Sequence, residues 1–254
     1  MDGSMQPLPY LPIVNPLDLY AIEAGLRIKE SEAEVSLVAV SMGPPSAEAA
    51  LKEAIAMGCD DAILLTGREF SGADTWATAR SLSAAIEKLG PVDLVLCGEK
   101  ATDGDTGQVG PEIAAFLDLP VITYASSLAI SKGTVRAERI TEDGTELVEC
   151  ELPLVMTFCK GFGEPRLPLL AGKRRAHGIS PRQLAPADLG LPLEQLGTKG
   201  SPTKVSKIAS PELVRKAELI DARGEEGLDR AVGRIIEILR GQRLIAQGAG
   251  RKEA

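Results

Sequence analysis

The chain has 254 residues, of which 44% are hydrophobic and only 3% aromatic, and its net charge at pH 7 is −8. This length supports one good-sized hydrophobic core plus an appendage, built mainly from Ala, Val, Leu and Ile. The acidic balance argues against nucleic acid or an anionic membrane surface as the main partner.

Scarce residue types argue against several kinds of site. His177 is the only histidine, which speaks against a Ser-His-Asp triad or a multi-histidine metal site. The cysteines lack Cys-x-x-Cys spacing and stand in settings typical of buried reduced thiols: Cys59, Cys97, Cys150 and Cys159. No apolar run approaches the roughly 18 residues of a spanning helix, and no Lys or Arg precedes Arg27, so no signal or transit peptide is evident. We expect a cytoplasmic protein without membrane insertion.

Short apolar strands alternate with helices along the first half of the chain. The predicted order is helix 17–30, strand 35–40, helix 46–57, strand 61–65, helix 75–89, strand 92–97 and helix 111–117. Such alternation predicts an α/β fold: a three-layer, doubly wound, mostly parallel sheet covered by helices on both faces. Strands follow from about residue 121 to 159, including a hairpin that turns at residues 142–145.

The loop between strand 92–97 and the next helix is rich in glycine. It contains Gly98, Gly104, Gly107 and Gly110, and the helix is expected to begin near Pro111. Glycines let backbone amides approach a ligand closely, and a helix start adds partial positive charge. A strand, a glycine loop and a helix start together hold phosphate in α/β proteins, so the loop predicts a nucleotide site. Thr106 and Gln108 add uncharged hydrogen-bonding side chains.

Two other interpretations of this loop remain open. Asp103-Gly104-Asp105 has the spacing of a metal site for a nucleotide sugar, although no third acidic ligand is evident nearby. Alternatively the segment is a solvated turn whose aspartates cap the next helix. The loop matches neither Gly-x-Gly-x-x-Gly nor a Walker phosphate loop, so no generic fingerprint decides between these interpretations.

A second pattern spans the hairpin. Its residues fall at the spacing of a known signature: Arg139, Glu142, Asp143, Gly144, Glu146, Val148, Pro153 and Thr157. This pattern resembles the signature of the electron-transfer flavoprotein β subunit, and the glycine loop resembles that family's nucleotide loop. Further segments are similar in the same order: Asn15-Pro16-Leu17-Asp18, Ser41-Met42-Gly43-Pro44, residues 56–60 and Glu164-Pro165-Arg166. The resemblance covers roughly residues 13–175.

The resemblance implies a heterodimeric electron carrier rather than an enzyme in its own right. The partner α subunit of such proteins holds FAD, and the β subunit holds either structural AMP or, in the electron-bifurcating type, a second FAD that oxidises NADH. Flavin-dependent dehydrogenases, such as acyl-CoA dehydrogenase, exchange electrons with the carrier. The cofactor-binding positions it implies are Asn15, Asp18, Ser41, Met42, Thr75, Thr78, Gly98, Asp103, Gly104, Asp105, Thr106, Gly107, Gln108, Val109 and Gly110.

The choice between FAD and AMP rests on weak differences. The segment from Asp103 to Pro111 is more similar to the bifurcating type, and so is the segment 72–78. There Asp74 can cap a helix, while Thr75 and Thr78 lie on one helical face. An ordinary capped helix explains the same residues. Non-redox nucleotide sensors of the same α/β architecture are a further alternative, against which the hairpin signature and the arm after residue 166 both argue.

The two ends of the chain depart from the core pattern. The chain begins with a proline-rich segment containing Pro7, Pro9 and Pro12, which cannot form the family's first central strand. That strand is therefore expected to lie upstream of this start, to be supplied by another chain, or to be lost. We therefore divide the chain into an α/β domain (1–165), an extended arm that recognises partners (166–209), and a helical segment packing on the partner subunit (210–254).

Two features of the C-terminal part point to partners. Leu170 stands at the spacing where the family places an anchor leucine for its dehydrogenase, although Leu167, Leu169 and Leu170 could equally pin the arm to the α subunit. A helix signal returns at Ser210-Pro211-Glu212. The last helix carries an apolar stripe, which packs either in the core or on a partner: Leu228, Val232, Ile235, Ile236 and Leu239.

Overall fold

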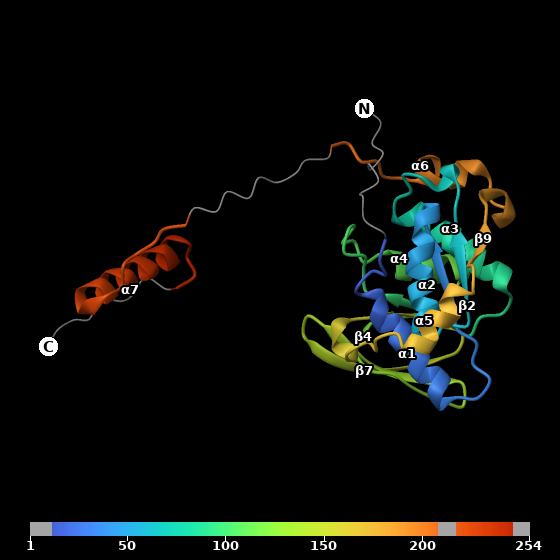
Figure 1. Ribbon diagram of the computed structural model, residues 1–254, viewed down its shortest axis with the longest axis horizontal. Helices are drawn as coiled ribbons and strands as arrows, with labels where there is room; N and C mark the ends of the chain where they lie inside the picture. The colour runs from blue at the N-terminus through green and yellow to red at the C-terminus, as the bar shows by residue number, and fades with distance from the viewer. Residues whose placement is uncertain (1–11, 208–216, 246–254) are drawn as a thin grey trace. The chain divides into compact units, whose positions relative to one another are not determined.

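The computed structural model describes residues 12–207 and 217–245 of the chain. The chain forms two compact units, one up to Ser206 and one from Lys207 onward (Figure 1). In the first unit the strands are β1 (Val38–Met42), β2 (Asp61–Leu65), β3 (Leu94–Gly98), β4 (Val121–Ala125), β5 (Ala129–Ser131), β6 (Thr134–Thr141), β7 (Gly144–Glu151), β8 (Leu154–Phe158) and β9 (Arg182–Leu184). Its helices are α1 (Asp18–Ser31), α2 (Glu48–Met57), α3 (Thr75–Leu89), α4 (Val109–Leu117), α5 (Leu170–His177) and α6 (Gly197–Gly200).

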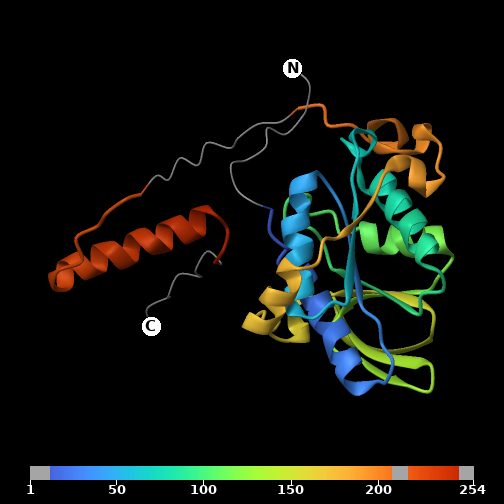
Figure 2. The same cartoon turned by 45° about the vertical axis from the view of Figure 1, so that its right-hand side comes forward.

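The strands lie between two layers of helices, which confirms the expected α/β class. In Figure 2 they stand between α2 on one side and α3 with α4 on the other. One sheet has the order β1-β2-β9, and all its pairs are parallel. The other has the order β3-β8-β4-β6-β5, with β7 on β6, and turns antiparallel at β6. The hairpin forms as expected, with Thr141 paired to Gly144.

The two sheets end at strands that face a common helix. β1 and β3 are outer strands and are only partly buried although mainly apolar, whereas β8 is buried throughout. A Cβ on Gly25 of α1 would lie 2.7 Å from Leu37, the residue just before β1, and 3.2 Å from Leu96 of β3, so α1 packs against β3 and against the approach to β1. No described strand pairs with the free side of β1 or β3. The proline-rich start, on which the expectation of a missing strand rests, lies almost wholly outside the described residues.

The segment 166–209 differs from the extended arm that we expected. Its helix α5 packs on α2 so closely that a side chain on Gly172 would collide with the backbone of Ala56. β9 then adds a third parallel strand beside β2, and Leu189 and Leu196 are buried in the core next to it. Residues 166–206 are therefore part of the first unit. The sequence shows no helical or strand period here because elements such as α5 and β9, with eight and three residues, are too short to repeat one.

The second unit contains one long helix, α7 (Gly224–Gly241). The apolar stripe lies on it as expected, and Leu228, Val232 and Ile235 are exposed within the described part of the chain. The predicted helix start at residues 210–212 lies outside the described residues. None of the helices described here is long and apolar enough to cross a membrane.

Candidate functional site

The glycine loop runs from the end of β3 to the start of α4. Two residues near the N-terminus, Asn15 and Asp18, bind its backbone. Asp18 accepts a hydrogen bond from the Gly98 amide at 2.7 Å. Asn15 donates to the Lys100 carbonyl at 2.9 Å and accepts from the Thr102 amide at 3.1 Å. Burial raises the pKa of Asp18, against the opposing effect of the hydrogen bonds that it accepts from the Gly98 amide and from the Asn15 side chain. The polar atoms of Asn15 and Asp18 are thus used to position the loop.

Two positions in the loop require glycine, each for a different structural reason. A Cβ on Gly110 would lie 2.5 Å from the Thr157 methyl group, so only glycine lets the first turn of α4 pack on β8. Gly107 has a φ of 66°, which residues with a side chain rarely adopt. Gln108 then follows at φ −101° and ψ −28°. A residue of positive φ followed by a right-handed one turns neighbouring amides to the same side, a geometry that binds anions.

The loop presents unpaired donors at the start of α4. Within the described part of the chain, the backbone amides of Thr106, Gly107 and Gln108 donate to no protein acceptor. The first amides of α4, at Val109 and Gly110, add the partial positive charge of a helix start. The helix begins two residues before the expected Pro111, which stands in the first turn, where its missing N–H costs no hydrogen bond. The arrangement can hold a phosphate group.

Asp103 and Asp105, the two aspartates considered above as a metal pair, are both exposed on the loop. Asp105 forms an ion pair with Lys100, with 2.7 Å between Oδ1 and Nζ. No group of three or more His, Cys, Asp and Glu residues that could hold a metal ion occurs in the residues described. Neither aspartate caps α4, since its N-cap residue Gln108 makes no side-chain cap. The helix-capping part of the turn interpretation is therefore wrong, whereas the loop is exposed, as that interpretation expected.

The start of α3 lies against this loop. Asp74 caps α3 by accepting from the Ala77 amide at 3.1 Å, as expected. The Thr75 hydroxyl lies 3.0 Å from Oε1 of Glu112 and 3.4 Å from Oε1 of Gln108, which joins α3 to the loop. Burial raises the pKa of Glu112, whose Oε2 is buried without a hydrogen-bond partner. Glu112 gives no signal in the sequence, because an acidic residue in a helix's first turn is usually a solvent-exposed partner of the helix dipole.

The hairpin signature meets the loop at the end of β4. Arg139 donates to the Thr123 carbonyl at 3.3 Å and to its hydroxyl at 3.0 Å, and it pairs with Glu146. Thr157 accepts from the Tyr124 amide at 3.0 Å. The signature residues therefore brace the end of β4, beside the glycine loop. Sequence alone gave no signal for Tyr124.

Comparison with known proteins shows the family of this chain. The family model described as "Electron transfer flavoprotein domain" matches residues 12–187. The chain belongs to the electron transfer flavoprotein family.

Among its relatives are named β subunits of this family. The electron transfer flavoprotein subunit beta of Thermoanaerobacterium thermosaccharolyticum is 43% identical over 224 residues, covering 88% of this chain and 85% of the relative. Subunit CarD of the caffeyl-CoA reductase-Etf complex of Acetobacterium woodii is 41% identical, covering 82% and 79%. Protein FixA of Azotobacter vinelandii is 42% identical, covering 83% and 77%.

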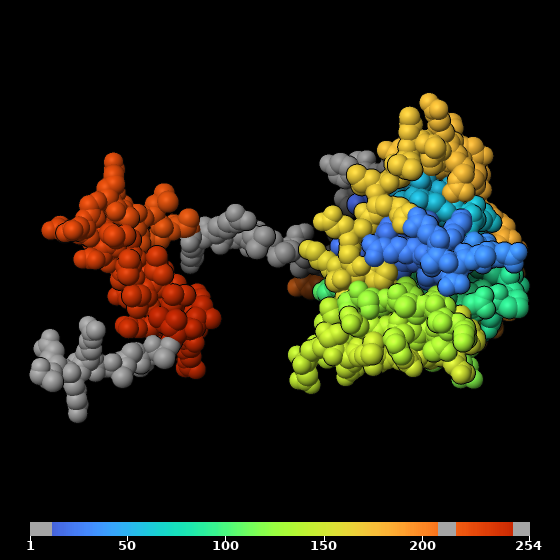
Figure 3. Space-filling model, turned by 90° about the horizontal axis from the view of Figure 1, so that it is seen from below, coloured from blue at the N-terminus to red at the C-terminus, as the bar shows by residue number. Residues whose placement is uncertain are grey.

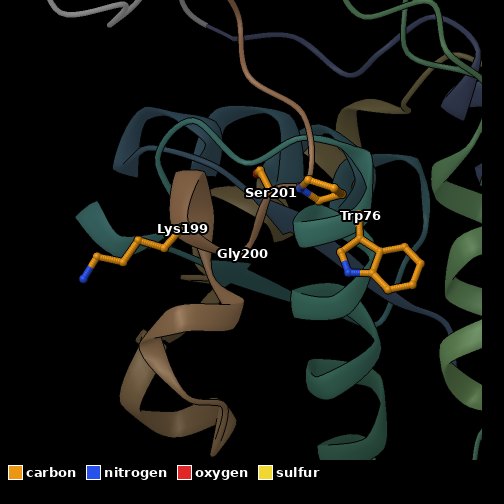
Figure 4. A pocket seen from close by; sticks show the side chains of 5 residues that line it. Trp76, Lys199, Gly200 and Ser201 are labelled. Carbon is orange, nitrogen blue, oxygen red and sulfur yellow. The ribbon is translucent and has the colours of Figure 1, made fainter.

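Other positions that the electron transfer flavoprotein resemblance implied as cofactor-binding make no hydrogen bond to the glycine loop among the described residues. Ser41 and Met42 end β1, and no hydrogen bond among the described residues links their side chains to the glycine loop. Thr78 lies one turn after Thr75 in α3 and is half-buried. A surface pocket of about 510 Å³ beside α3 is lined by Trp76 and residues 199–202 and includes no loop residue (Figure 4). Trp76 meanwhile packs edge-on against Phe116 of α4, with 4.7 Å between ring centroids.

The Glu-Pro-Arg motif of this electron transfer flavoprotein chain fixes the segment after β8 to α1. Arg166 donates to Glu23 at 2.8 Å and also pairs with Glu30. Glu23 has a side chain only 5% exposed; burial alone would raise its pKa, but hydrogen bonds from Arg166 and Arg27 outweigh this and lower the pKa to about 2. Figure 3 shows α1 as a blue band beside the gold segment that comes after β8 in the chain.

The leucines after this motif are exposed. Leu167, Leu169 and Leu170 have exposed fractions of 85%, 75% and 67%. Leu170 is the first residue of α5, so its backbone is anchored on α2 while its side chain faces away from the first unit's core.

Proposed function

We propose that the chain is the β subunit of a heterodimeric electron transfer flavoprotein and binds an adenine nucleotide at the glycine loop. The single observation that carries this is the set of unpaired amides at Thr106, Gly107 and Gln108, held in place by Asn15 and Asp18 at the start of α4. Converging amides at a helix start are suited to a phosphate. The relatives are named as electron transfer subunits, which fits a carrier that has no catalytic residues of its own.

The residues on the outer side of the loop, away from the core, are also suited to an adenine nucleotide. A Cβ on Gly104 would meet nothing within 4 Å, so the loop's rim is open to a ligand. Thr75 and the buried Oε2 of Glu112 supply polar atoms where α3 meets the loop. Because the pKa of Glu112 is raised, its carboxyl group is more readily protonated and can then donate a hydrogen bond.

We favour FAD over AMP as the nucleotide in this subunit. The support is the similarity of residues 103–111 and 72–78 to the bifurcating type, together with the Thr75 contacts to Gln108 and Glu112. A second flavin, when bound, would supply hydride acceptance from NADH and one-electron transfer in two directions. The chain's own residues would bind the phosphates, orient the nucleotide and brace the loop. Structural AMP on the same amides is the alternative.

Nucleotide content of the complex tests this proposal. The chain is co-expressed with its partner α subunit, the heterodimer is purified, and flavin is measured from the visible spectrum and AMP by chromatography after denaturation. We expect two flavins per heterodimer. One flavin with one AMP would keep the carrier function and overturn the choice of FAD. A heterodimer without flavin would overturn the electron-transfer function and favour a non-redox nucleotide sensor.

We also propose that Leu170 anchors a flavin-dependent dehydrogenase, such as an acyl-CoA dehydrogenase. An exposed leucine on a segment fixed by Arg166 and α5 can enter a partner's pocket at little cost in ordering. Leu170→Ala should slow electron delivery to the dehydrogenase several-fold, measured by dye-coupled turnover at limiting carrier.

The matched control for this prediction is Leu193→Ala, since Leu193 is also exposed but lies beyond the Glu-Pro-Arg motif and α5. It should leave the rate unchanged. Flavin content and heterodimer stability should stay at the wild-type level in both variants. Loss of flavin or dissociation of the Leu170 variant would instead show that the leucine packs against the α subunit.

A further inference from the structure

One residue beside the glycine loop has a strained backbone. Tyr124, in β4, has a φ of 56°. For a bulky residue with a Cβ this region is a genuine outlier, and such outliers persist only where the surrounding structure holds them. The pairing of β4 with β8 shifts register between Ile122 and Ala125, so the strain lies at a bulge. Bulges of this kind turn a side chain in a new direction.

Several contacts hold Tyr124 in this conformation. Its amide donates to the Thr157 hydroxyl at 3.0 Å, and its carbonyl accepts from the Cys159 thiol at 3.6 Å. Thr123, the residue before Tyr124, accepts hydrogen bonds from Arg139 at both its carbonyl and its hydroxyl. Thr157 itself is 2% exposed, so the strained residue is fixed to a rigid buried strand.

The bulge directs the phenol toward the glycine loop. The Tyr124 hydroxyl lies 3.5 Å from the position that a Cβ on Gly107 would take, next to the side chain of Lys100. The residue is 40% exposed, and its hydroxyl has no hydrogen-bond partner within the part of the chain that the structure describes. A free hydroxyl donor therefore stands beside the unpaired amides of residues 106–108.

We propose that Tyr124 is a phosphate-binding residue, whose hydroxyl donates a hydrogen bond to the nucleotide phosphate held by the loop amides. This rests on the proposed nucleotide site and adds a ligand contact from outside the loop. Hydrogen bonds from a neutral donor to a charged oxygen are strong, which gives the strained backbone a function. Arg139 and Thr157 act as positioning residues for this contact.

The test compares AMP with adenosine, which lacks the phosphate. Both are titrated by calorimetry into the heterodimer after its bound nucleotide has been removed by exhaustive dialysis. Tyr124→Phe keeps the ring and the backbone strain and removes only the hydroxyl. We expect it to weaken AMP binding roughly tenfold, as for one hydrogen bond to a charged group, and to leave adenosine binding unchanged. Equal AMP affinity of variant and wild type, or an equal loss for adenosine, would overturn the assignment.

A second pair of variants separates strain from ligand binding. Tyr124→Gly removes the strain as well as the phenol, so its heterodimer should melt no lower than the wild type while binding AMP at least tenfold more weakly. Lys132→Gly removes a similar strain (φ 50°) in the turn between β5 and β6 and should leave AMP binding intact. Undiminished AMP binding by Tyr124→Gly would overturn the inference. Failure of the wild-type heterodimer to bind AMP at all would instead overturn the nucleotide site on which it rests.

Discussion

A heterodimer that carries Gly107→Val should fold and pair with its partner, yet be purified without nucleotide in this subunit. The positive φ of Gly107 is unfavourable for valine, so the backbone would move to a more ordinary conformation. The amides of Gly107 and Gln108 would then no longer point to the same side. Each lost hydrogen bond to a charged phosphate costs about 1.5–3 kcal/mol, so losing two lowers affinity by a hundredfold or more.

Sterically, the substitution leaves the core intact. A Cβ at Gly107 would stand 3.4 Å from the Glu99 carbonyl and 3.5 Å from the Tyr124 hydroxyl, both ordinary contacts. At Gly98, by contrast, a Cβ would lie 2.7 Å from the backbone of Leu17, so substitution there would disturb the packing of α1. Gly107 is thus the loop glycine whose replacement reports most directly on the ligand.

Gly133→Val is the matched control for this experiment. Gly133 has a φ of 80°, a Cβ there would meet nothing within 4 Å, and it lies in the turn between β5 and β6. It introduces the same kind of backbone strain away from the loop. Nucleotide is measured by chromatography after denaturation, and folding by circular dichroism. We expect the control to lose some thermal stability but no nucleotide. Full occupancy in a folded Gly107→Val heterodimer would contradict the loop assignment.

The long elements of the fold could be predicted from the sequence because each carries its own period. α3 was expected at residues 75–89, and the structure places it at Thr75–Leu89. β2 likewise occupies residues 61–65 as expected. β1 begins three residues later than predicted, since an apolar run alone does not say where pairing with β2 starts. Local pattern therefore determined element type better than element boundaries.

Tertiary contacts explain what the sequence did not reveal. β9 is a strand because β2 offers a free parallel edge, and no property of Arg182-Gln183-Leu184 announces this. Asn15 and Asp18 stay predicted nucleotide contacts, but the sequence did not reveal that their polar atoms also bind each other and the loop's own backbone. Tyr124 escaped notice because a positive φ at tyrosine depends on Thr157 and Arg139, which lie far away in the sequence.

The amphipathic helix α7 should decide whether the chain stays with its α subunit. It exposes Leu228, Val232 and Ile235 in the described part of the chain, and only Gly227 is buried among its residues. An 18-residue helix with so little burial is not stabilised by core packing of its own unit. An apolar stripe of this length is suited to the interface of a permanent complex, which is larger and more apolar than a transient one.

Two glutamates in this stripe, Val232→Glu together with Ile235→Glu, should abolish co-purification with the partner subunit. Burying one such side chain contributes about 1.5–3 kcal/mol, and an unpaired buried charge adds a further penalty. The two substitutions together should therefore remove most of the binding free energy of this surface. Deleting residues 210–254 should have the same effect and leave the α/β unit folded, because the core clusters of that unit contain no residue of α7.

Gly233→Glu is the matched control, since it adds the same charge to the same helix at a position where a Cβ would meet nothing within 4 Å. With about 3.6 residues per turn, position 233 lies beside the stripe, roughly 110° around the helix from its centre, so this variant should co-purify as well as the wild type. The measurement is the α-to-β ratio after affinity capture of a tagged α subunit, with circular dichroism to check folding. If the double glutamate variant is retained at the wild-type ratio, the stripe does not bind the partner. The contacts that hold the heterodimer together must then lie on the α/β unit, where the exposed leucines around Leu170 would be the next surface to test.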